Sequence, residues 1–147
     1  MREQGPGVRK HSRKREAILE LIRSTPSHPG AQWIYDSLKP LIPDLSLGTV
    51  YRNISLFREE GSVVSVGVVN GEERFDAVTS PHPHWVCEGC GRVLDLPRIE
   101  GELLDRLGCP ERESGYVTDF RKTVFYGRCP ECGSGDTPPE PSDLRVM

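Results

Sequence analysis

The sequence predicts an α+β fold with two domains, the first mainly helical and the second mainly built from strands. Three amphipathic segments fall within residues 12–61, a pair of strand-like runs follows them, and two Cys-x2-Cys motifs enclose most of the second half of the chain. We expect a first domain at residues 1–78, a second domain at 79–133, and a disordered tail rich in Pro and acidic residues at 134–147.

Apolar residues at helical spacing predict three helices. The first begins after Ser12, a residue type favoured at helix N-caps, and ends before the Pro and Gly residues of STPSHPG. The second lies within GAQWIYDSLKPLIPD and stops at Pro40, because proline cannot continue a helix. The third begins after Ser46 and ends at Gly61, a typical C-terminal stop.

A β-hairpin is predicted directly after the third helix. Two strand-like runs in SVVSVGVVNGEERFDAV flank Asn70-Gly71, the dipeptide that best suits a two-residue type I′ turn. Three short helices followed by a hairpin describe a winged helix, a helix-turn-helix variant whose third helix enters the major groove of DNA. The alternative is a small helical module whose polar third helix only faces water.

The distribution of charge and polar groups supports DNA binding. Residues 1–60 carry ten Lys and Arg against seven Asp and Glu, whereas residues 61–147 carry nine against fifteen. The basic excess lies at the start of the first helix, where it would attract phosphate, and the third helix exposes groups that can bond to base edges. The expected contacts to double-stranded DNA are Arg13, Lys14, Arg15, Ser46, Thr49, Tyr51, Arg52 and Asn53.

The second domain is predicted to have the order β, β, α, β. Short strands are expected in HWVCE and GRVLDL, an amphipathic helix in PRIEGELLDRLG, and a long strand in SGYVTDFRKTVFYGRC. The apolar surface of these elements exceeds what so short a segment can bury alone, so we expect a homodimer.

Four cysteines have the spacing of a metal site. Cys87 and Cys90 form one Cys-x2-Cys motif, and Cys129 and Cys132 form the other. Two intervening residues let both sulfurs of a motif bind one ion, and four thiolates are typical of closed, structural Zn2+ sites. A redox dithiol or an iron–sulfur cluster is the alternative. The fifth cysteine, Cys109, is interpreted as a small apolar residue or a free thiol.

Two histidines lie beside this site in an extended segment. His82 and His84 are separated by one residue, so their rings point to the same side of a strand. Asp76 precedes them and Asp95 follows them. A second metal site and a group of surface polar residues are both compatible with this pattern. His28, taken alone, is interpreted as a turn residue.

Five segments resemble the ferric uptake regulator family of bacterial metal-dependent repressors over residues 8 to 133. In order, they are SHPGAQWIYDSL, LSLGTVYRNISLFREEGSV, ERFD, PHPHWVCEGCGRVLDL and FYGRCPEC. The resemblance implies a homodimeric repressor that binds operator DNA. It also implies an N-terminal winged helix, a C-terminal dimerisation domain, a structural Zn2+ on the four cysteines and a separate regulatory metal site.

By position, the resemblance implies a regulatory site made of His28, Asp76, His82, His84 and Asp95. One ion bound by all five would join the two domains across DAVTSPHPH, which we interpret as a hinge. Three imidazoles and two carboxylates suit Fe2+ or Mn2+, although intrinsic affinity would favour Zn2+. Bound metal would favour the arrangement in which both recognition helices of the dimer reach successive major grooves.

Three features resemble the peroxide-sensing branch of the family, in which site-bound Fe2+ reacts with H2O2 and a ligand histidine is oxidised. The last ligand is Asp95, where iron sensors more often have Glu. SPHPH lacks the additional histidine of many iron sensors, and VTDFRKTVFYG lacks a strand histidine. His28 and His82 are the expected targets of oxidation. Regulation by the supply of iron, manganese or zinc is the alternative within the family.

Other classes of function fit the sequence less well. The alternatives outside the family are a metalloenzyme and a zinc-knuckle interaction module. We expect no enzyme, because five protein ligands leave little room for substrate and no nucleophile with a partnered base is apparent. We also expect a cytoplasmic protein without a membrane partner. No run of eighteen apolar residues is present, and MREQGPGVRKHSRKR is too polar for a secretory signal.

Overall fold

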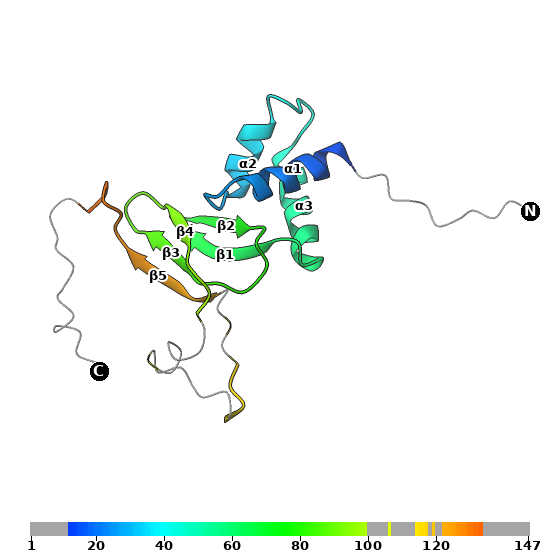
Figure 1. The fold of residues 1–147 in the computed structure, drawn as a ribbon. Coiled ribbons are helices and arrows are strands. Elements are labelled where there is room, and N and C mark those ends of the chain that lie inside the picture. Colours follow the sequence, from blue (N-terminus) through cyan, green and yellow to red (C-terminus); the bar gives the residue numbers. More distant parts are fainter. Residues whose placement is uncertain (1–11, 100–105, 107–113, 118, 120–121, 134–147) are drawn as a thin grey trace, which may run out of the picture.

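The computed structural model describes residues 12–99, 106, 114–117, 119 and 122–133. Three helices come first, α1 (Arg13–Ser24), α2 (Ala31–Leu38) and α3 (Leu47–Glu59). The strands are β1 (Val64–Val69), β2 (Glu72–Asp76), β3 (His84–Cys87), β4 (Val93–Asp95) and β5 (Val124–Gly127). Figure 1 shows the helices grouped at one end, β3 to β5 at the other, and β1 and β2 between them. The predicted α+β class is confirmed.

The helices pack around a single apolar core. Its buried members come mainly from one face of each helix, including Ile18, Ile34, Ile54 and Phe57, and from the segments that connect the helices and lead to the hairpin. Phe75 of β2 belongs to the same cluster, so the hairpin is packed against the helices. Three helices followed by a hairpin, packed together around this core, form a winged helix.

The termini of α3 agree with the sequence signals. Ser46 is the N-cap, and its hydroxyl accepts a hydrogen bond from the backbone N–H of Thr49 at 3.1 Å. Gly61 follows the helix with a φ of 75°, a conformation that glycine adopts without steric cost. The helix therefore begins and ends where the sequence predicts.

The hairpin turn also has the predicted form. Strands β1 and β2 pair antiparallel, and the two turn residues Asn70 and Gly71 have φ values of 52° and 82°. Positive φ at both central residues is the requirement of a type I′ turn.

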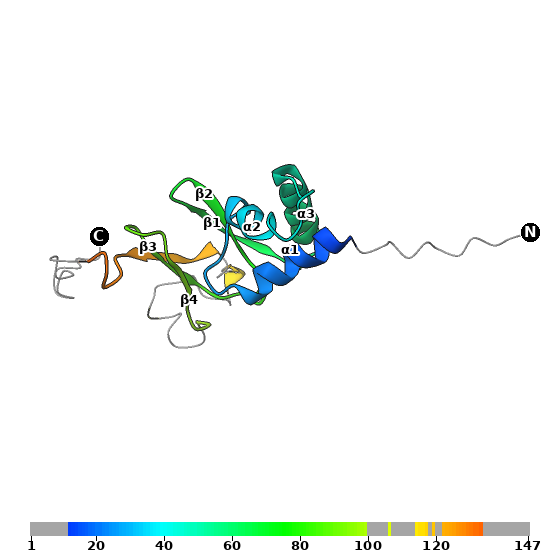
Figure 2. The same cartoon turned by 90° about the horizontal axis from the view of Figure 1, so that it is seen from above.

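The second sheet has the order β4-β3-β5. Strand β3 is antiparallel to β4 and parallel to β5, and its register places His84 directly opposite Asp95. Figure 2 shows this sheet from above, extending away from the helices. The two cysteine motifs lie at the same end of the sheet, because Cys87 ends β3 and Cys129 follows β5.

The hairpin packs against this second sheet, a contact that the sequence did not predict. Val66 and Val69 of β1 form a buried cluster with Val86 of β3 and Val93 of β4, and the partly buried Val124 of β5 packs against it. The segment DAVTSPHPH, interpreted as a hinge, thus connects two parts that already share an apolar contact.

One predicted element is wrong. The long strand expected over residues 114–129 is a short strand, β5, that begins at Val124. Gly115 has a φ of 82° and Ser114 lies in a short 3-10 turn, so these two residues, at the predicted start, do not have the extended backbone of a strand. Most of the predicted helix at 97–108, Cys109 and the tail at 134–147 lie outside the described residues. Within the described part of the chain, no helix has the length and apolar composition needed to cross a bilayer.

The helical core yields a prediction about stability. Replacing Phe57, which is fully buried, by Ala should lower the free energy of unfolding by about 3–5 kcal/mol. Its neighbour Leu56 is 42% exposed, and Leu56→Ala should change stability by less than about 1 kcal/mol. Urea unfolding of both variants at constant zinc would test this. Equal losses would contradict the assignment of Phe57 to the core.

Candidate metal centres

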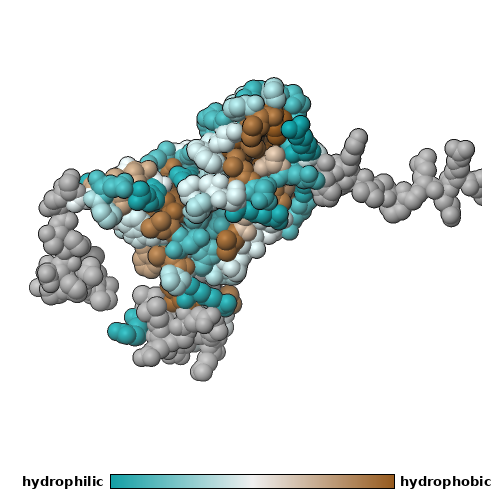
Figure 3. All heavy atoms as spheres, turned by 45° about the horizontal axis from the view of Figure 1, so that its top comes forward, coloured by the Kyte–Doolittle hydropathy of each residue, from teal (hydrophilic) through white to brown (hydrophobic). Residues whose placement is uncertain are grey.

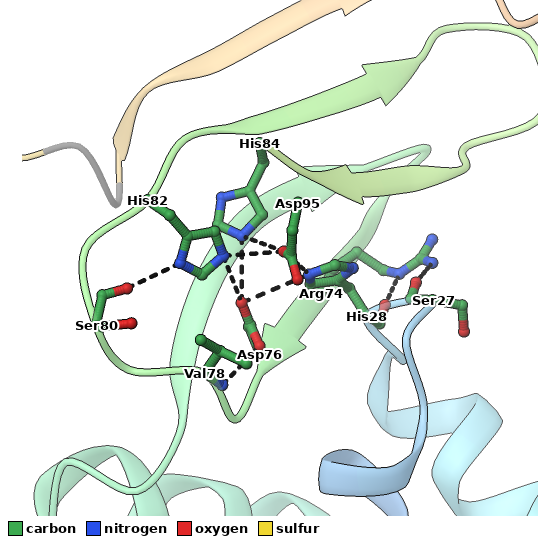
Figure 4. A network of polar contacts seen from close by, with 9 residues as sticks. All are labelled: Ser27, His28, Arg74, Asp76, Val78, Ser80, His82, His84 and Asp95. Atoms are coloured by element: carbon green, nitrogen blue, oxygen red, sulfur yellow. Dashed lines mark hydrogen bonds and ion pairs between the residues drawn. The ribbon is translucent and has the colours of Figure 1, made fainter. Parts of the chain in front are cut away.

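Five of the predicted site residues meet in one place. One ligand atom from each residue lies within 4.8 Å of every other in the cluster of His28, Asp76, His82, His84 and Asp95. His28 is in the loop between α1 and α2, Asp76 ends β2 and Asp95 ends β4. Figure 4 shows the three imidazoles and two carboxylates pointing toward one another. We call this group the His/Asp cluster.

Two carboxylate oxygens face the Nε2 atoms of all three histidines. Asp95 Oδ1 is 2.7 Å from Nε2 of His28, 2.9 Å from that of His82 and 3.3 Å from that of His84. The corresponding distances from Asp76 Oδ2 are 3.5, 3.1 and 3.3 Å. Ligand atoms about 2.1 Å from one ion are about 3 Å apart at right angles, so these five donors can surround a single cation.

Local structure brings the donors together. His84 and Asp95 are cross-strand partners, and His82 lies two residues before His84 in an extended segment, so its ring lies on the same side. The Asp76 carboxylate accepts a hydrogen bond from the backbone N–H of Val78 at 2.7 Å, which leaves its other oxygen for the histidines. His28 has a φ of 54°, a left-handed conformation that is uncommon outside glycine.

The tautomer of His82 suits metal binding. Its Nδ1 lies 2.8 Å from the carbonyl oxygen of Ser80, which can only accept, so Nδ1 carries a proton. In the neutral ring, Nε2 then presents a lone pair to the carboxylate oxygens of Asp76 and Asp95. That contact is favourable only when a proton or a metal cation lies between them. A hydrogen bond of this kind on the far nitrogen is typical of metal-binding histidines.

Burial and charge shift the pKa values in opposite ways. For His28, burial opposes protonation, but the hydrogen bond to Asp76 and the nearby charge of Asp95 outweigh it, so its pKa is raised. For His82, burial is likewise outweighed by the Ser80 carbonyl and by Asp95, and its pKa is also raised. Burial works to raise the pKa of Asp76, yet hydrogen bonds from His28 and His84 hold it well below its usual range. The cluster therefore attracts positive charge.

One side of the His/Asp cluster opens to a pocket. Four of its members are buried, but the Asp95 side chain is 45% exposed. A pocket of ≈ 350 Å³ reaches His28, Asp76 and Asp95. Its other walls come from the end of α1, the turn after it and the residues after β2, namely Ile22, Arg23, Ser24, Thr25, Pro26, Ala77 and Val78. Small molecules from solvent can reach the cluster on this side.

The four cysteines form a second, separate cluster. The sulfurs of Cys87, Cys90, Cys129 and Cys132 all lie within 4.8 Å of one another, and those of Cys90 and Cys129 are 3.8 Å apart. Sulfurs about 2.3 Å from a tetrahedral Zn2+ are about 3.8 Å apart, so the four fit a closed zinc site. Gly89 permits this approach, because a Cβ there would lie 2.7 Å from the Cβ of Cys132.

The cysteine sulfurs also show unequal acidity. Backbone N–H groups of Cys90 and Cys129 hydrogen-bond the sulfur of Cys87 and lower its pKa to about 6. The thiol of Cys132 interacts with the Cys129 sulfur, and burial adds to this effect, so the pKa of Cys132 is raised to about 12. Four adjacent thiolates repel one another unless a cation neutralises them, which is the chemistry of a metal site rather than of four free thiols.

The expected DNA contacts lie on α1 and α3. Arg13 is exposed, but Lys14 is paired with Asp44 at 2.6 Å and Arg15 with Glu60 at 2.5 Å, so these two cations also hold the helical domain together. On α3, Tyr51 and Arg52 are exposed and Thr49 and Asn53 are half-buried. Arg52 donates to the Thr49 hydroxyl at 3.2 Å, and Asn53 donates to the Thr49 carbonyl at 2.8 Å.

Two groups at the His/Asp cluster escaped the sequence analysis. One is the Ser80 carbonyl that orients His82, and the other is Arg74, whose guanidinium contacts the backbone of the His28 loop. Every residue has a backbone carbonyl, so the sequence alone cannot show which carbonyl will bind a histidine. Arg74 does stand in the ERFD segment, directly before two buried residues of β2, which was an available signal.

Comparison with known proteins agrees with this geometry. The family model described as "Ferric uptake regulator family" matches residues 7–108. The chain belongs to the ferric uptake regulator family. Among curated relatives, the peroxide operon regulator of Bacillus subtilis (strain 168) is 35% identical over 119 residues, which cover 81% of each chain.

Solved structures of the ferric uptake regulator family have the same fold. The Campylobacter jejuni peroxide stress regulator is 28% identical with a TM-score of 0.65, covering 81% of this chain and 88% of its own. The ferric uptake regulator from Pseudomonas aeruginosa, solved with manganese, is 28% identical with a TM-score of 0.63, covering 82% of this chain and 90% of its own. The winged helix followed by a small second domain is thus the architecture of a family of regulators.

The raised histidine pKa values predict a pH dependence of stability. The folded state holds protons on His28 and His82 more tightly than the unfolded chain, whose histidines titrate near 6.5. This contribution is fully present below that pH and is lost as the pH rises through the raised values. Without added iron or manganese and at constant zinc, the melting temperature should fall more between pH 6 and pH 8 than that of His28→Gln. Parallel pH profiles for the two proteins would refute this.

Proposed function

We propose that this protein is a homodimeric repressor that binds operator DNA when a regulatory metal is bound and releases it in response to peroxide. The observation that carries the proposal is the convergence of five metal-binding side chains from both parts of the molecule. The similarity to peroxide regulators over 81% of the chain supports the choice of signal.

The two clusters would hold different ions. Cys87, Cys90, Cys129 and Cys132 would bind Zn2+ structurally, because four soft thiolates leave no open position for chemistry. The His/Asp cluster of His28, Asp76, His82, His84 and Asp95 would bind Fe2+ or Mn2+, which accept a mixed shell of nitrogen and oxygen. The manganese in the related P. aeruginosa regulator supports this assignment.

The His/Asp cluster supplies a mechanism for the switch. His28 comes from the helical part, whereas His84 and Asp95 come from the second sheet. Without a cation, the lone pairs of neutral imidazoles and of carboxylates face one another and repel. A cation between them removes this repulsion. Bound metal would therefore favour the closed arrangement of the two parts, and its loss would release the helical part from the sheet.

DNA binding would use the winged helix. We place this domain at residues 1–78, with Ser46, Thr49, Tyr51, Arg52 and Asn53 of α3 at the major groove. The basic residues Arg13, Lys14 and Arg15 would lie toward phosphate.

Dimerisation would use the second domain, which we place at residues 79–133, before the tail at 134–147. In the single chain this domain exposes apolar side chains of Leu94, Phe125 and Tyr126, by 46%, 42% and 61%. Figure 3 shows apolar areas on both the helical part and the sheet part of the molecule. Covering the exposed side chains of β4 and β5 in a dimer would remove them from water.

The peroxide response would be an oxidation at the His/Asp cluster. Fe2+ held by these five residues would supply the redox chemistry that activates H2O2 and would return to Fe2+, because both electrons that reduce H2O2 come overall from the histidine C–H bond. One oxygen atom enters a ring C–H bond of His28 or His82, and the other leaves as water, so the histidine is the group that is oxidised. An oxidised imidazole is a poorer ligand, so metal and DNA are released together.

Removal of His28 tests the switch. His28→Ala should abolish the stimulation of DNA binding by Mn2+ while leaving the dimer and the four-cysteine zinc intact, because His28 is the one ligand from the helical part. The measurement is a gel-shift titration on a duplex that the wild-type protein selects from a random pool with Mn2+ present. Ser27→Ala, next to it and exposed, is the matched control. Unchanged affinity in His28→Ala would eliminate this mechanism.

Intact mass tests the signal. After loading with Fe2+ and exposure to H2O2, the chain should gain about 16 Da, one oxygen atom, on a peptide containing His28 or His82. Loading with Mn2+ should give no gain, because Mn2+ does not donate an electron to peroxide as readily. Absence of the gain in the Fe2+ sample would leave a regulator that responds to metal supply alone.

A further inference from the structure

Arg74 contacts three backbone carbonyls that belong to two separate segments of the chain. Its guanidinium donates to the carbonyl of Ser27 at 2.8 Å, to that of His28 through Nε, and to that of Gly91 at 3.2 Å. Figure 4 shows the contacts with Ser27 and His28 beside the His/Asp cluster. A planar guanidinium can serve three acceptors from three separate nitrogen atoms in one plane, whereas an ammonium group has all its donors on a single nitrogen.

The first segment is the loop that carries His28. This residue has a φ of 54°, so its backbone is in a conformation that side chains other than Gly rarely adopt and that the surroundings must hold. The same part of β2 supplies further anchors, a hydrogen bond from Phe75 N–H to the Pro29 carbonyl at 3.1 Å and a β-bridge between Gly30 and Arg74. The Arg74 bonds to Ser27 and His28 extend this attachment to the ligand residue itself.

The second segment is the turn between β3 and β4. Gly91 follows Cys90, has a φ of 73° and donates its N–H to the Cys87 carbonyl at 2.9 Å. A Cβ at Gly91 would lie 2.8 Å from the Nδ2 of Asn70, which is closer than a Cβ normally approaches another heavy atom. The turn therefore packs closely against the hairpin that contains Arg74. Two residues beyond Gly91 begins β4, the strand that ends at Asp95.

We infer that Arg74 is a positioning residue of the regulatory metal site. It joins the His28 loop to the turn at Gly91 and thereby sets the His28 imidazole at its place opposite Asp95. Asp76 lies two residues along the same strand, so Arg74 relates three of the five ligand segments to one another. This inference rests on the proposed regulatory site. It adds that the site depends on the guanidinium of Arg74, which does not contact the metal.

The test compares metal affinity in variants of the full, zinc-loaded chain. Arg74→Lys and Arg74→Gln should bind Mn2+ about 10- to 100-fold more weakly, the usual effect of removing a group that orients a ligand. Arg58→Gln is the matched control, since it removes the same charge from an exposed side chain that pairs with Glu73 on the hairpin, and it should bind Mn2+ normally. Should Arg74→Gln fail to fold, Arg74→Lys, which keeps the charge and the aliphatic stem, carries the comparison.

A second readout separates positioning from a general structural role. With Co2+ as the probe in the same site, the visible d–d spectrum of Arg74→Lys should resemble that of His28→Ala, because both lose the His28 ligand. In the His28→Ala background, Arg74→Lys should cause almost no additional loss of affinity. Wild-type affinity in Arg74→Lys, or equal losses in both backgrounds, would overturn the inference. A wild-type chain that binds neither Mn2+ nor Co2+ beyond its zinc would instead overturn the proposed function itself.

Discussion

The arrangement on which the structure depends is electrostatic: three imidazole Nε2 atoms face two carboxylate oxygens at distances of 2.7 to 3.5 Å in a largely buried space. Donor atoms that carry lone pairs cannot approach so closely without positive charge between them. Protons supply it in part, as the raised pKa values of His28 and His82 indicate. One divalent cation would supply it better, because it can be shared by all five donors at once. Since His28 belongs to the helical part, binding of the proposed metal and the arrangement of the two parts would form a single equilibrium.

Other parts of the molecule prepare this arrangement. The cysteine cluster joins the end of β3 to the segment after β5, which holds the sheet that presents His84 and Asp95. Val66 and Val69 pack the hairpin against that sheet, and Phe75 packs the same hairpin into the helical core. The hairpin is therefore shared by both parts of the molecule, and Asp76, a proposed ligand, is its last residue. The proposed hinge begins at the end of this hairpin. The two parts could therefore separate there only if the apolar contacts of the hairpin or the bound ion were lost.

The sequence was informative where a feature depends on near neighbours. The three helices and the Asn70-Gly71 turn follow from local rules of periodicity and backbone freedom, and they are confirmed. The spacing of the cysteines predicts that the four sulfurs meet, and they do. The approach of His28 to Asp95 depends on tertiary packing, and only resemblance to a family suggested it. The valine cluster and the three bonds of Arg74 join segments that no local pattern relates. The long strand is wrong at its predicted start, where Gly115 has a left-handed backbone.

The same geometry distinguishes the two histidines proposed as targets of peroxide. His82 is fixed by the Ser80 carbonyl through Nδ1, whereas Nδ1 of His28 is buried without a hydrogen-bond partner among the described residues. The pocket that reaches the cluster is lined by His28 and by the half-exposed Asp95, but His82 is not one of its walls. This pocket gives solvent a route to His28, although the His28 side chain is only 3% exposed and that of His82 is 10% exposed. Because His28 is also the proposed ligand from the helical part, its oxidation would break directly the contact that joins metal binding to DNA binding, whereas oxidation of His82 would do so only by releasing the metal.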